Sequence, residues 1–226
     1  MASEYPRSLT REEFERAIWL DFEGGRNHPP TFAGYLIGDN YDIDIVDSEF
    51  FCLSESPHEL GCRELDQFRE WLVEKALVED RVIIGYSEHE FNIITEDDYY
   101  KEPMEELYRN ANLLTKSYFK RNRRTTFRRL NDVARNEGRR VSLKDYLKLD
   151  YVGYEYPDDL GDFRPSSAIG NLVSQCRRRG RYSMISEQSK ERLDTLVTYN
   201  EHDCRGMKHL IEYIFSRNRS IDELSH

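Results

Sequence analysis

Residues 17–23, AIWLDFE, constrain the fold of this chain most, because they combine an apolar strand with two acids. Side chains alternate across a β-strand, so Trp19, Asp21 and Glu23 would share one face. The α carbons of the two acids would lie roughly 7 Å apart. An isolated D-x-E is most simply the wet face of a strand. Here Trp19 and the β-rich segments that follow favour a central strand, where unpaired charges are costly.

The next segments predict a layered α/β domain. Residues 30–39 and 41–52 alternate in polarity around a turn at 38–40, which predicts a three-stranded antiparallel meander with the first strand. Apolar residues at intervals of three and four predict an amphipathic helix over 63–78. A short buried strand, RVIIGY, follows at 81–86.

The remainder of the chain is predicted to be mainly helical. Thr10 and Glu13 have the spacing of a capping box, which predicts a short helix before the first strand. Further predicted elements are helical pieces at 89–98 and 103–110, a short strand within 110–119, a short helix after Ser142, an aperiodic loop at 151–165 and a long helix over 187–217.

The length of 226 residues suits one buried core. We therefore expect one α/β domain over residues 15–217 with a mixed central sheet flanked by helices. An extension with a short helix would precede it at 1–14, and a tail would follow at 218–226.

Charge and cysteine usage exclude several classes of protein. A formal net charge of -10 argues against a protein that simply coats nucleic acid. The 4 cysteines form no C-x-x-C pair and no zinc-type cluster, which indicates reduced thiols. The apolar runs are too short for a membrane span, and the N-terminus lacks the features of a signal or transit peptide. We therefore expect a cytoplasmic protein with no membrane association.

A second group of candidate residues lies in the long predicted helix. Tyr199 and Asp203 are four residues apart and so lie on one helical face. Leu196, Met207 and Leu210 continue that face, so Asp203 interrupts an apolar stripe. A buried Asp must be paired or bound to a metal. The competing explanation is an ion pair with a core Arg or Lys.

A third group begins a helix directly after the strand at 81–86. Glu88, His89 and Glu90 are all candidates there. Acids in a first helical turn are also explained by their favourable interaction with the helix dipole.

Taken together, these sites resemble the DEDD exonuclease superfamily, whose RNase H-like fold uses acids from three motifs to hold two divalent metals. The resemblance covers nearly the whole chain. Asp21 and Glu23 match the first motif, D-x-E, and Tyr199 with Asp203 matches the Y-x-x-x-D motif of the tyrosine subclass.

The second motif connects the chain with a particular branch of that superfamily. The segments WLDFEGG, TFAGYLIGD, SLK at 142–144 and YNEHDC are most similar to a bacterial branch of predicted RNase H-like nucleases. In that branch the second motif often reads Y-x-x-x-E. Tyr86 and Glu90 fit this form and select Glu90 over Glu88, although most characterised superfamily members place Asp there.

The resemblance implies phosphodiester hydrolysis, with 3′-5′ exonuclease action on single-stranded DNA or RNA. Two Mg²⁺ or Mn²⁺ ions would be the cofactors, since carboxylates suit hard cations. Asp21 would bridge both ions, Glu23 and Asp203 would complete the site, and Glu90 would be the fourth ligand. Because an unperturbed tyrosine has a pKa of about 10, Tyr199 is expected to orient water.

A basic stretch is the candidate contact for nucleic acid. Its arginines and lysines could bind phosphates while an aromatic ring stacks on a base, although a solvated helix face explains them equally well. The residues concerned are Lys120, Arg121, Arg123, Arg124 and Phe127. The arginines at 177–181 are more simply a flexible loop, and Asp42 and Asp44 more simply face solvent.

Two other functions compete with the nuclease. One is a catalytically weak or inactive RNase H-like module that binds nucleic acid or a partner protein. The other is a structural protein whose acids pair with arginines. A partner nucleic-acid enzyme acting in trans is also compatible with the resemblance, and the sequence leaves DNA versus RNA and the oligomeric state open.

Overall fold

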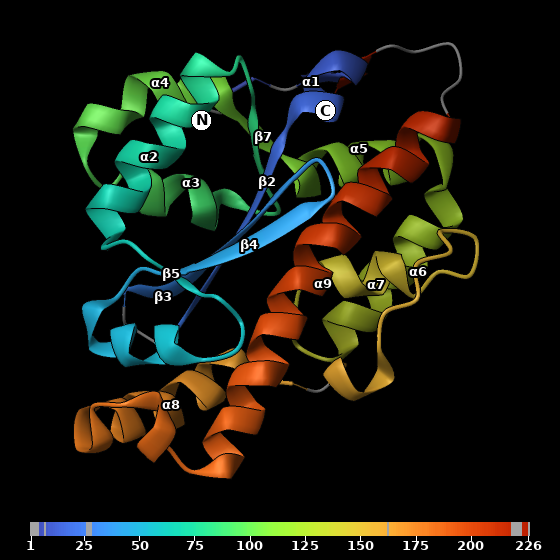
Figure 1. Ribbon diagram of the computed structural model, residues 1–226. Helices are drawn as coiled ribbons and strands as arrows, with labels where there is room; N and C mark the ends of the chain where they lie inside the picture. The colour runs from blue at the N-terminus through green and yellow to red at the C-terminus, as the bar shows by residue number, and fades with distance from the viewer. Residues whose placement is uncertain (1–4, 7, 26–28, 162, 218–222, 226) are drawn as a thin grey trace.

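The computed structural model describes residues 5–6, 8–25, 29–161, 163–217 and 223–225. Its centre is a six-stranded mixed sheet in the order β5-β4-β3-β2-β6-β7 (Figure 1). The strands are β2 (Ile18–Gly24), β3 (Pro30–Ile37), β4 (Asn40–Ile45), β5 (Gly61–Cys62), β6 (Ile83–Gly85) and β7 (Tyr108–Asn110). β2, β3 and β4 are antiparallel, whereas β6 is parallel to both β2 and β7. The predicted α/β class, meander and mixed sheet are therefore confirmed.

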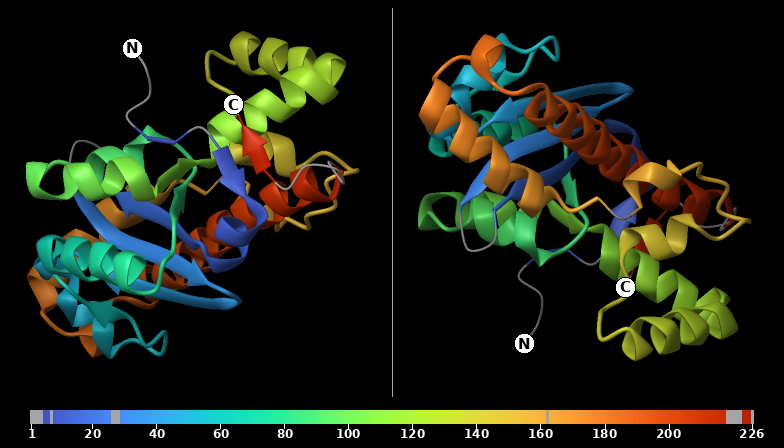
Figure 2. Two further views of the ribbon diagram at one scale, coloured as in Figure 1. Left: turned by 90° about the horizontal axis from the view of Figure 1, so that it is seen from above. Right: turned by 90° about the horizontal axis from the view of Figure 1, so that it is seen from below.

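Helices cover both faces of this sheet (Figures 1 and 2). Ile18, Leu20 and Phe22 pack against α2, α3 and α4, while Trp19 faces the core formed with α5, α7 and α9. The helices are α1 (Arg11–Arg16), α2 (Leu65–Val78), α3 (Glu88–Ile94), α4 (Lys101–Leu107), α5 (Ala111–Asn122), α6 (Arg124–Asn136), α7 (Leu143–Leu147), α8 (Pro165–Arg179) and α9 (Glu187–Arg217). Single turns of 3-10 helix lie at Asp98–Tyr100, Asp158–Leu160 and Tyr182–Met184. Among the described residues, no helix is long and apolar enough to cross a membrane.

Four predicted elements differ from the structure. The helical piece predicted at 103–110 is helix only as far as Leu107, where α4 ends, and β7 follows it. β4 ends at Ile45, and a 3-10 helix at Ser48–Glu55 follows because the Asp47 side chain caps it by accepting from the Glu49 backbone amide. Most of the predicted strand at 110–119 is helix α5, since the Asn110 side chain caps its first turn and ends β7. The arginines expected in a loop at 177–181 begin inside α8, whose last turn contains 177–179.

The two ends of the described chain lie together. β1 (Ser8–Thr10) pairs antiparallel with β8 (Glu223–Ser225), and the capping box between Thr10 and Glu13 starts α1 as predicted. The predicted boundaries after residues 14 and 217 stay predictions. The pairing of β1 with β8 nevertheless joins the extension to the tail.

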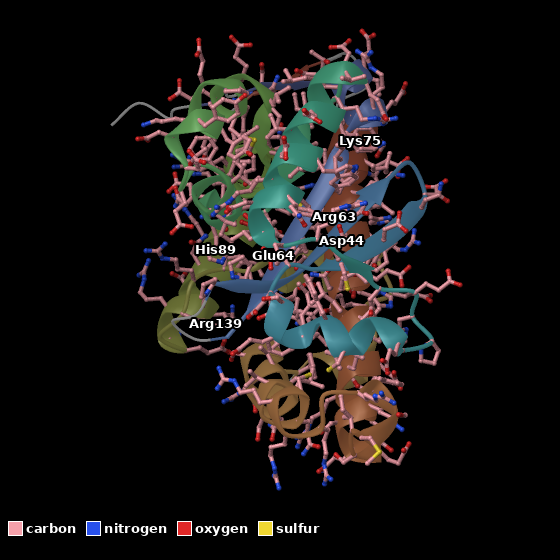
Figure 3. The ribbon with its side chains drawn as sticks, turned by 60° about the vertical axis from the view of Figure 1, so that its left-hand side comes forward. Asp44, Arg63, Glu64, Lys75, His89 and Arg139 are labelled. Atoms are coloured by element: carbon pink, nitrogen blue, oxygen red, sulfur yellow. The ribbon has the colours of Figure 1, made fainter. Side chains whose placement is uncertain are left out.

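Asp44 does not face solvent as predicted. Only 2% of Asp44 is exposed, and the guanidinium of Arg63 donates a hydrogen bond to its carboxylate. The two side chains lie next to each other on the α2 side of the sheet (Figure 3). A Cβ at Gly61 would lie 1.7 Å from the Asp44 carboxylate, so only glycine lets β5 approach it. Asp42 remains exposed, because β5 pairs with β4 only at Asp44 and Ile45.

Candidate metal centre

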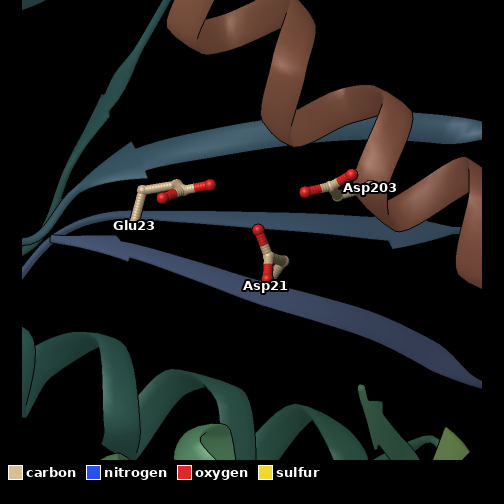
Figure 4. A group of neighbouring side chains, drawn as sticks. All are labelled: Asp21, Glu23 and Asp203. Carbon is tan, nitrogen blue, oxygen red and sulfur yellow. The ribbon is translucent and has the colours of Figure 1, made fainter. Parts of the chain in front are cut away.

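Three carboxylates from two elements meet at the centre of the sheet. Asp21 and Glu23 project from β2 on the face that also carries Trp19, as the alternation predicted. α9 crosses that face and contributes Asp203 (Figure 4). An oxygen atom from each of the three lies within 4.8 Å of the other two. Residues separated by about 180 positions in the sequence therefore form one acidic cluster, which we call the triad.

A buried amide fixes the position of Asp21. Asn200 is completely buried in α9, and its Nδ2 donates to Asp21 Oδ2 at 2.8 Å. The hydroxyl of Tyr41 donates to Asn200 Oδ1 at 2.8 Å, so the amide cannot rotate freely. A Cβ at Gly34 would lie 1.5 Å from that same Oδ1. The bare backbone of β3 is thus what lets α9 approach the sheet closely enough to hold Asp21.

Burial and mutual repulsion favour protonation of the triad. Burial, then the charges of Glu23 and Asp203, raises the pKa of Asp21 well above its usual value. Burial and the charge of Asp203 raise the pKa of Glu23 to about 8. Burial raises the pKa of Asp203 to about 6 against the opposing effect of the Lys144 ammonium. Carboxylates held in this way are stabilised by any added positive charge.

The triad borders a cavity of about 270 Å³. Four of the five predicted catalytic residues line it: Asp21, Glu90, Tyr199 and Asp203. Glu23 completes the triad beside them. Other lining residues are Tyr86, Ser87, Ser142, Leu143, Lys144 and Met207.

Glu90 reaches the cavity but is not part of the triad. It is buried, and its Oε2 accepts hydrogen bonds from the Ser87 amide at 3.0 Å and the Ser87 hydroxyl at 3.1 Å. The bond from the Ser87 amide is one half of the capping box of α3, and the Ser87 side chain accepts from the Glu90 backbone in the other half. The Tyr108 hydroxyl, which donates to the Ser87 carbonyl, lies 3.4 Å from Glu90 Oε2. The Oε2 atom of Glu90 therefore supports the helix, whereas Oε1 has no hydrogen-bond partner among the described residues.

Tyr199 and Lys144 both line the cavity. The Lys144 Nζ lies 3.9 Å from the centre of the Tyr199 ring, a distance suited to a cation–π interaction. Burial, followed by the charge of Asp203, raises the pKa of Tyr199 above its ordinary value. Burial lowers the pKa of Lys144 against the opposing effect of Asp203 and Glu23. Tyr199 thus keeps its proton at neutral pH.

Sequence reasoning missed two residues that contact the site. Lys144 belongs to the SLK segment, which was noted only as part of a family resemblance. The Tyr156 hydroxyl donates to Asp203 Oδ1 at 3.1 Å, but Tyr156 lies in the aperiodic loop at 151–165. No periodicity could place a residue of that loop, so only the folded chain reveals it.

The structure does not bring the predicted basic residues to the cavity. Lys120, Arg121, Arg123 and Arg124 are exposed around the junction of α5 and α6. The Arg123 guanidinium lies 5.2 Å from the centre of the Tyr151 ring. Phe127 is partly buried against the core.

Comparison with known proteins gave no match. Neither a protein-family model, nor a curated protein, nor a solved structure is similar to this chain. The geometry of the site therefore carries the functional argument.

Proposed function

We propose that this chain is a divalent-metal-dependent nuclease with an RNase H-like fold, which hydrolyses phosphodiester bonds as a 3′-5′ exonuclease on single-stranded DNA or RNA. The observation that carries the proposal is the triad, in which oxygens of Asp21, Glu23 and Asp203 lie within 4.8 Å of one another. The order of the central strands, with β2, β3 and β4 antiparallel and β6 and β7 parallel, supports the fold assignment.

The residues present fit a hard divalent cation. The triad offers only carboxylate oxygens, the donor type that Mg²⁺ and Mn²⁺ prefer. No arginine forms an ion pair with the triad among the residues that the structure describes, in contrast to Asp44. The three triad residues are half-buried, and carboxylates held close together without such a partner are costly unless a cation compensates them.

Asp21, Glu23 and Asp203 would hold one ion, and Asp21 with Glu90 would hold the second. Ions bound there would supply Lewis-acid activation of water and of the scissile phosphate. The proposal thus keeps all four predicted metal ligands, with Glu90 using the oxygen that does not cap α3.

The remaining polar residues position the reactants. The protonated Tyr199 hydroxyl can orient a water molecule at the cavity wall, and its raised pKa makes it a poor general base. The Lys144 ammonium can pair with a phosphate oxygen, because it lies at the same cavity. Tyr156 fixes the orientation of Asp203 through its hydrogen bond.

One observation favours a second candidate, a nucleic-acid-binding module with little or no catalysis. One carboxylate oxygen of Glu90 accepts hydrogen bonds from Ser87, so only the other oxygen is available to a second ion. A protein that binds oligonucleotides and one metal ion without cleaving would fit this candidate.

The test is hydrolysis of end-labelled single-stranded DNA and RNA with Mg²⁺, Mn²⁺ or EDTA. We expect metal-dependent shortening from the 3′ end. Asp21→Asn and Asp203→Asn should each lose about a thousandfold in rate, the equivalent of about 4 kcal/mol. Asp42→Asn is the matched control, since Asp42 is an exposed acid on β4. Undiminished cleavage by Asp203→Asn would refute the proposal.

A further inference from the structure

A second concave surface adjoins the cavity. An open groove of about 510 Å³ lies between the start of α8 and the N-terminal half of α9. Phe163, Arg164, Gln188, Glu191, Arg192 and Thr195 are among its lining residues. Figure 1 shows α8 packed beside this part of α9. The function proposed above does not use this groove.

The groove and the cavity share a boundary at Tyr199. The Phe163 ring, which lines the groove, has its centre 5.3 Å from that of the Tyr199 ring, which lines the cavity. Thr195, Tyr199 and Asp203 follow one another at intervals of four on α9, so they share one face of the helix. At 1.5 Å per residue, Arg192 lies about 16 Å along the helix from Asp203, a span of a few nucleotides. A linear substrate held at the triad would therefore extend into the groove.

The side chains of the groove suit a sugar-phosphate chain. Arg164 is exposed and Arg192 is half-buried, and neither forms an ion pair within the part of the chain that the structure describes. Guanidinium groups bind phosphate through paired hydrogen bonds. The Phe163 ring is only partly buried, and an aromatic face of this kind stacks on any base. Glu191 is the one acid among the residues named above, and it is exposed.

We propose that the α8–α9 groove binds the part of a single-stranded nucleic acid that lies outside the cavity, without regard to base sequence. Arg164 and Arg192 would contact phosphates, and Phe163 would stack on a base next to the cavity. This inference rests on the proposed function, because it assigns the same substrate to the neighbouring surface. It also places the nucleic-acid contact in this groove and not at the basic stretch at 120–124. That stretch lies with α5 and α6 at the opposite end of the molecule from α8 (Figure 2).

The test measures binding without cleavage. Fluorescein-labelled oligothymidylate and oligouridylate dodecamers are titrated with the full chain in EDTA, and fluorescence anisotropy is followed at several salt concentrations. The variant carries Arg164→Glu and Arg192→Glu together. Arg178→Glu is the matched control. Arg178 is an exposed arginine in the last turn of α8, the helix that begins directly after Arg164.

We expect the double variant to bind both dodecamers at least tenfold more weakly, and the control to bind like the wild type. The slope of log affinity against log salt should fall in magnitude by about 1.4, since each phosphate contact to a single strand contributes about 0.7. If charge reversal unfolds the chain, as judged by circular dichroism, Arg164→Gln with Arg192→Gln carries the same test.

Unchanged affinity and salt slope in the double variant would overturn the inference, even if the wild type cleaves. Equal weakening of a polyglutamate peptide would also overturn it, since that result would indicate a general anion site. Weakened oligonucleotide binding alone would support the groove whether or not cleavage is observed. Failure of this inference and failure of the nuclease proposal are thus separate results.

Discussion

Asp44 and Asp21 are acids on two strands of one sheet, and the difference between them separates stability from function. Register places them on opposite faces, since Asp21 pairs with Gly34 and Asp44 with Ala33. Asp44 has the guanidinium of Arg63 as its partner. The neighbours of the Asp21 carboxylate are the Asn200 amide and the carboxylates of Glu23 and Asp203. The first arrangement satisfies a buried charge within the chain, whereas the second leaves negative charge for something from outside to neutralise.

The Arg63 side of the sheet is closed by packing as well as by charge. The Arg63 guanidinium lies 4.3 Å from the centre of the Trp71 ring and donates to the Tyr35 hydroxyl at 3.5 Å. Among the residues that the structure describes, no guanidinium pairs with the triad in this way. The Lys144 ammonium lowers the pKa of Asp203 by its charge, and it lies 3.9 Å from the centre of the Tyr199 ring. The structural hypothesis of acids paired with arginines therefore describes Asp44 but not the triad.

The largest effect on stability is expected from breaking the Asp44 pair. Arg63→Met should lower the free energy of unfolding by about 3 kcal/mol, because it leaves a buried carboxylate unpaired. Denaturant titration measures this, and the loss should be the same with Mn²⁺ or EDTA. Adding Asp44→Asn to Arg63→Met should restore part of the stability. A wild-type midpoint for Arg63→Met would show that the ion pair does not stabilise the fold.

The triad should respond in the opposite way. Asp21→Asn keeps the shape of the side chain while removing one of several repelling charges, so the variant in EDTA should be at least as stable as the wild type. Mn²⁺ at a hundred times its Kd should stabilise the wild type by about 2.7 kcal/mol and leave the variant unchanged. Thermal unfolding with Mn²⁺ and EDTA reports both. The comparison fails if Asp21→Asn destabilises the metal-free protein as Arg63→Met does.

Stability of the metal-free protein should fall as pH rises. The pKa values of Glu23, about 8, and Asp203, about 6, lie above their ordinary values, so the folded state retains protons that the unfolded state releases. The free energy of unfolding should therefore decline between pH 4 and pH 8. Glu23→Gln should flatten the part above pH 6, and saturating Mn²⁺ should oppose the decline. A rise in stability over this range would contradict the repulsion within the triad.

The smallest effect is expected at Tyr156. Tyr156→Phe removes the hydrogen bond to Asp203 and should weaken Mn²⁺ binding about tenfold, as loss of an orienting partner does. Tyr151→Phe is the matched control, since the Tyr151 hydroxyl contacts Thr126 on α6. Mn²⁺ titration of both variants decides the matter. Equal Mn²⁺ affinities of the two variants would show that Tyr156 does not orient Asp203 for metal binding.

Periodicity predicted the parts of the site that lie on regular elements. The strand alternation placed Asp21 and Glu23 on one face, and the apolar stripe of the long helix placed Asp203 against it. The same reasoning failed for Asp44, because its burial depends on residues from another part of the chain. Gly61 in β5 approaches it closely, and Arg63, just after β5, pairs with it. Asp42 and Asp44 lie on the same face of β4, yet one is exposed and the other is buried.

Contacts made by irregular chain were not predictable. Tyr156 reaches Asp203 from a loop without periodicity, and the groove depends on α8, which the sequence pattern did not reveal. Glu90 is an intermediate case. The spacing from Ser87 to Glu90 is that of a capping box, so its structural role was readable from the sequence alongside the proposed catalytic one.

Direct counting of bound Mn²⁺ tests the central claim best. Electron paramagnetic resonance of free Mn²⁺ is followed as the ion is titrated into the wild type, Asp203→Asn and Asp42→Asn. The account predicts two ions bound by the wild type and by Asp42→Asn, and loss of at least one of them in Asp203→Asn. Binding by Asp203→Asn equal to that of the wild type, or binding by none of the three proteins, would contradict the triad as a metal centre.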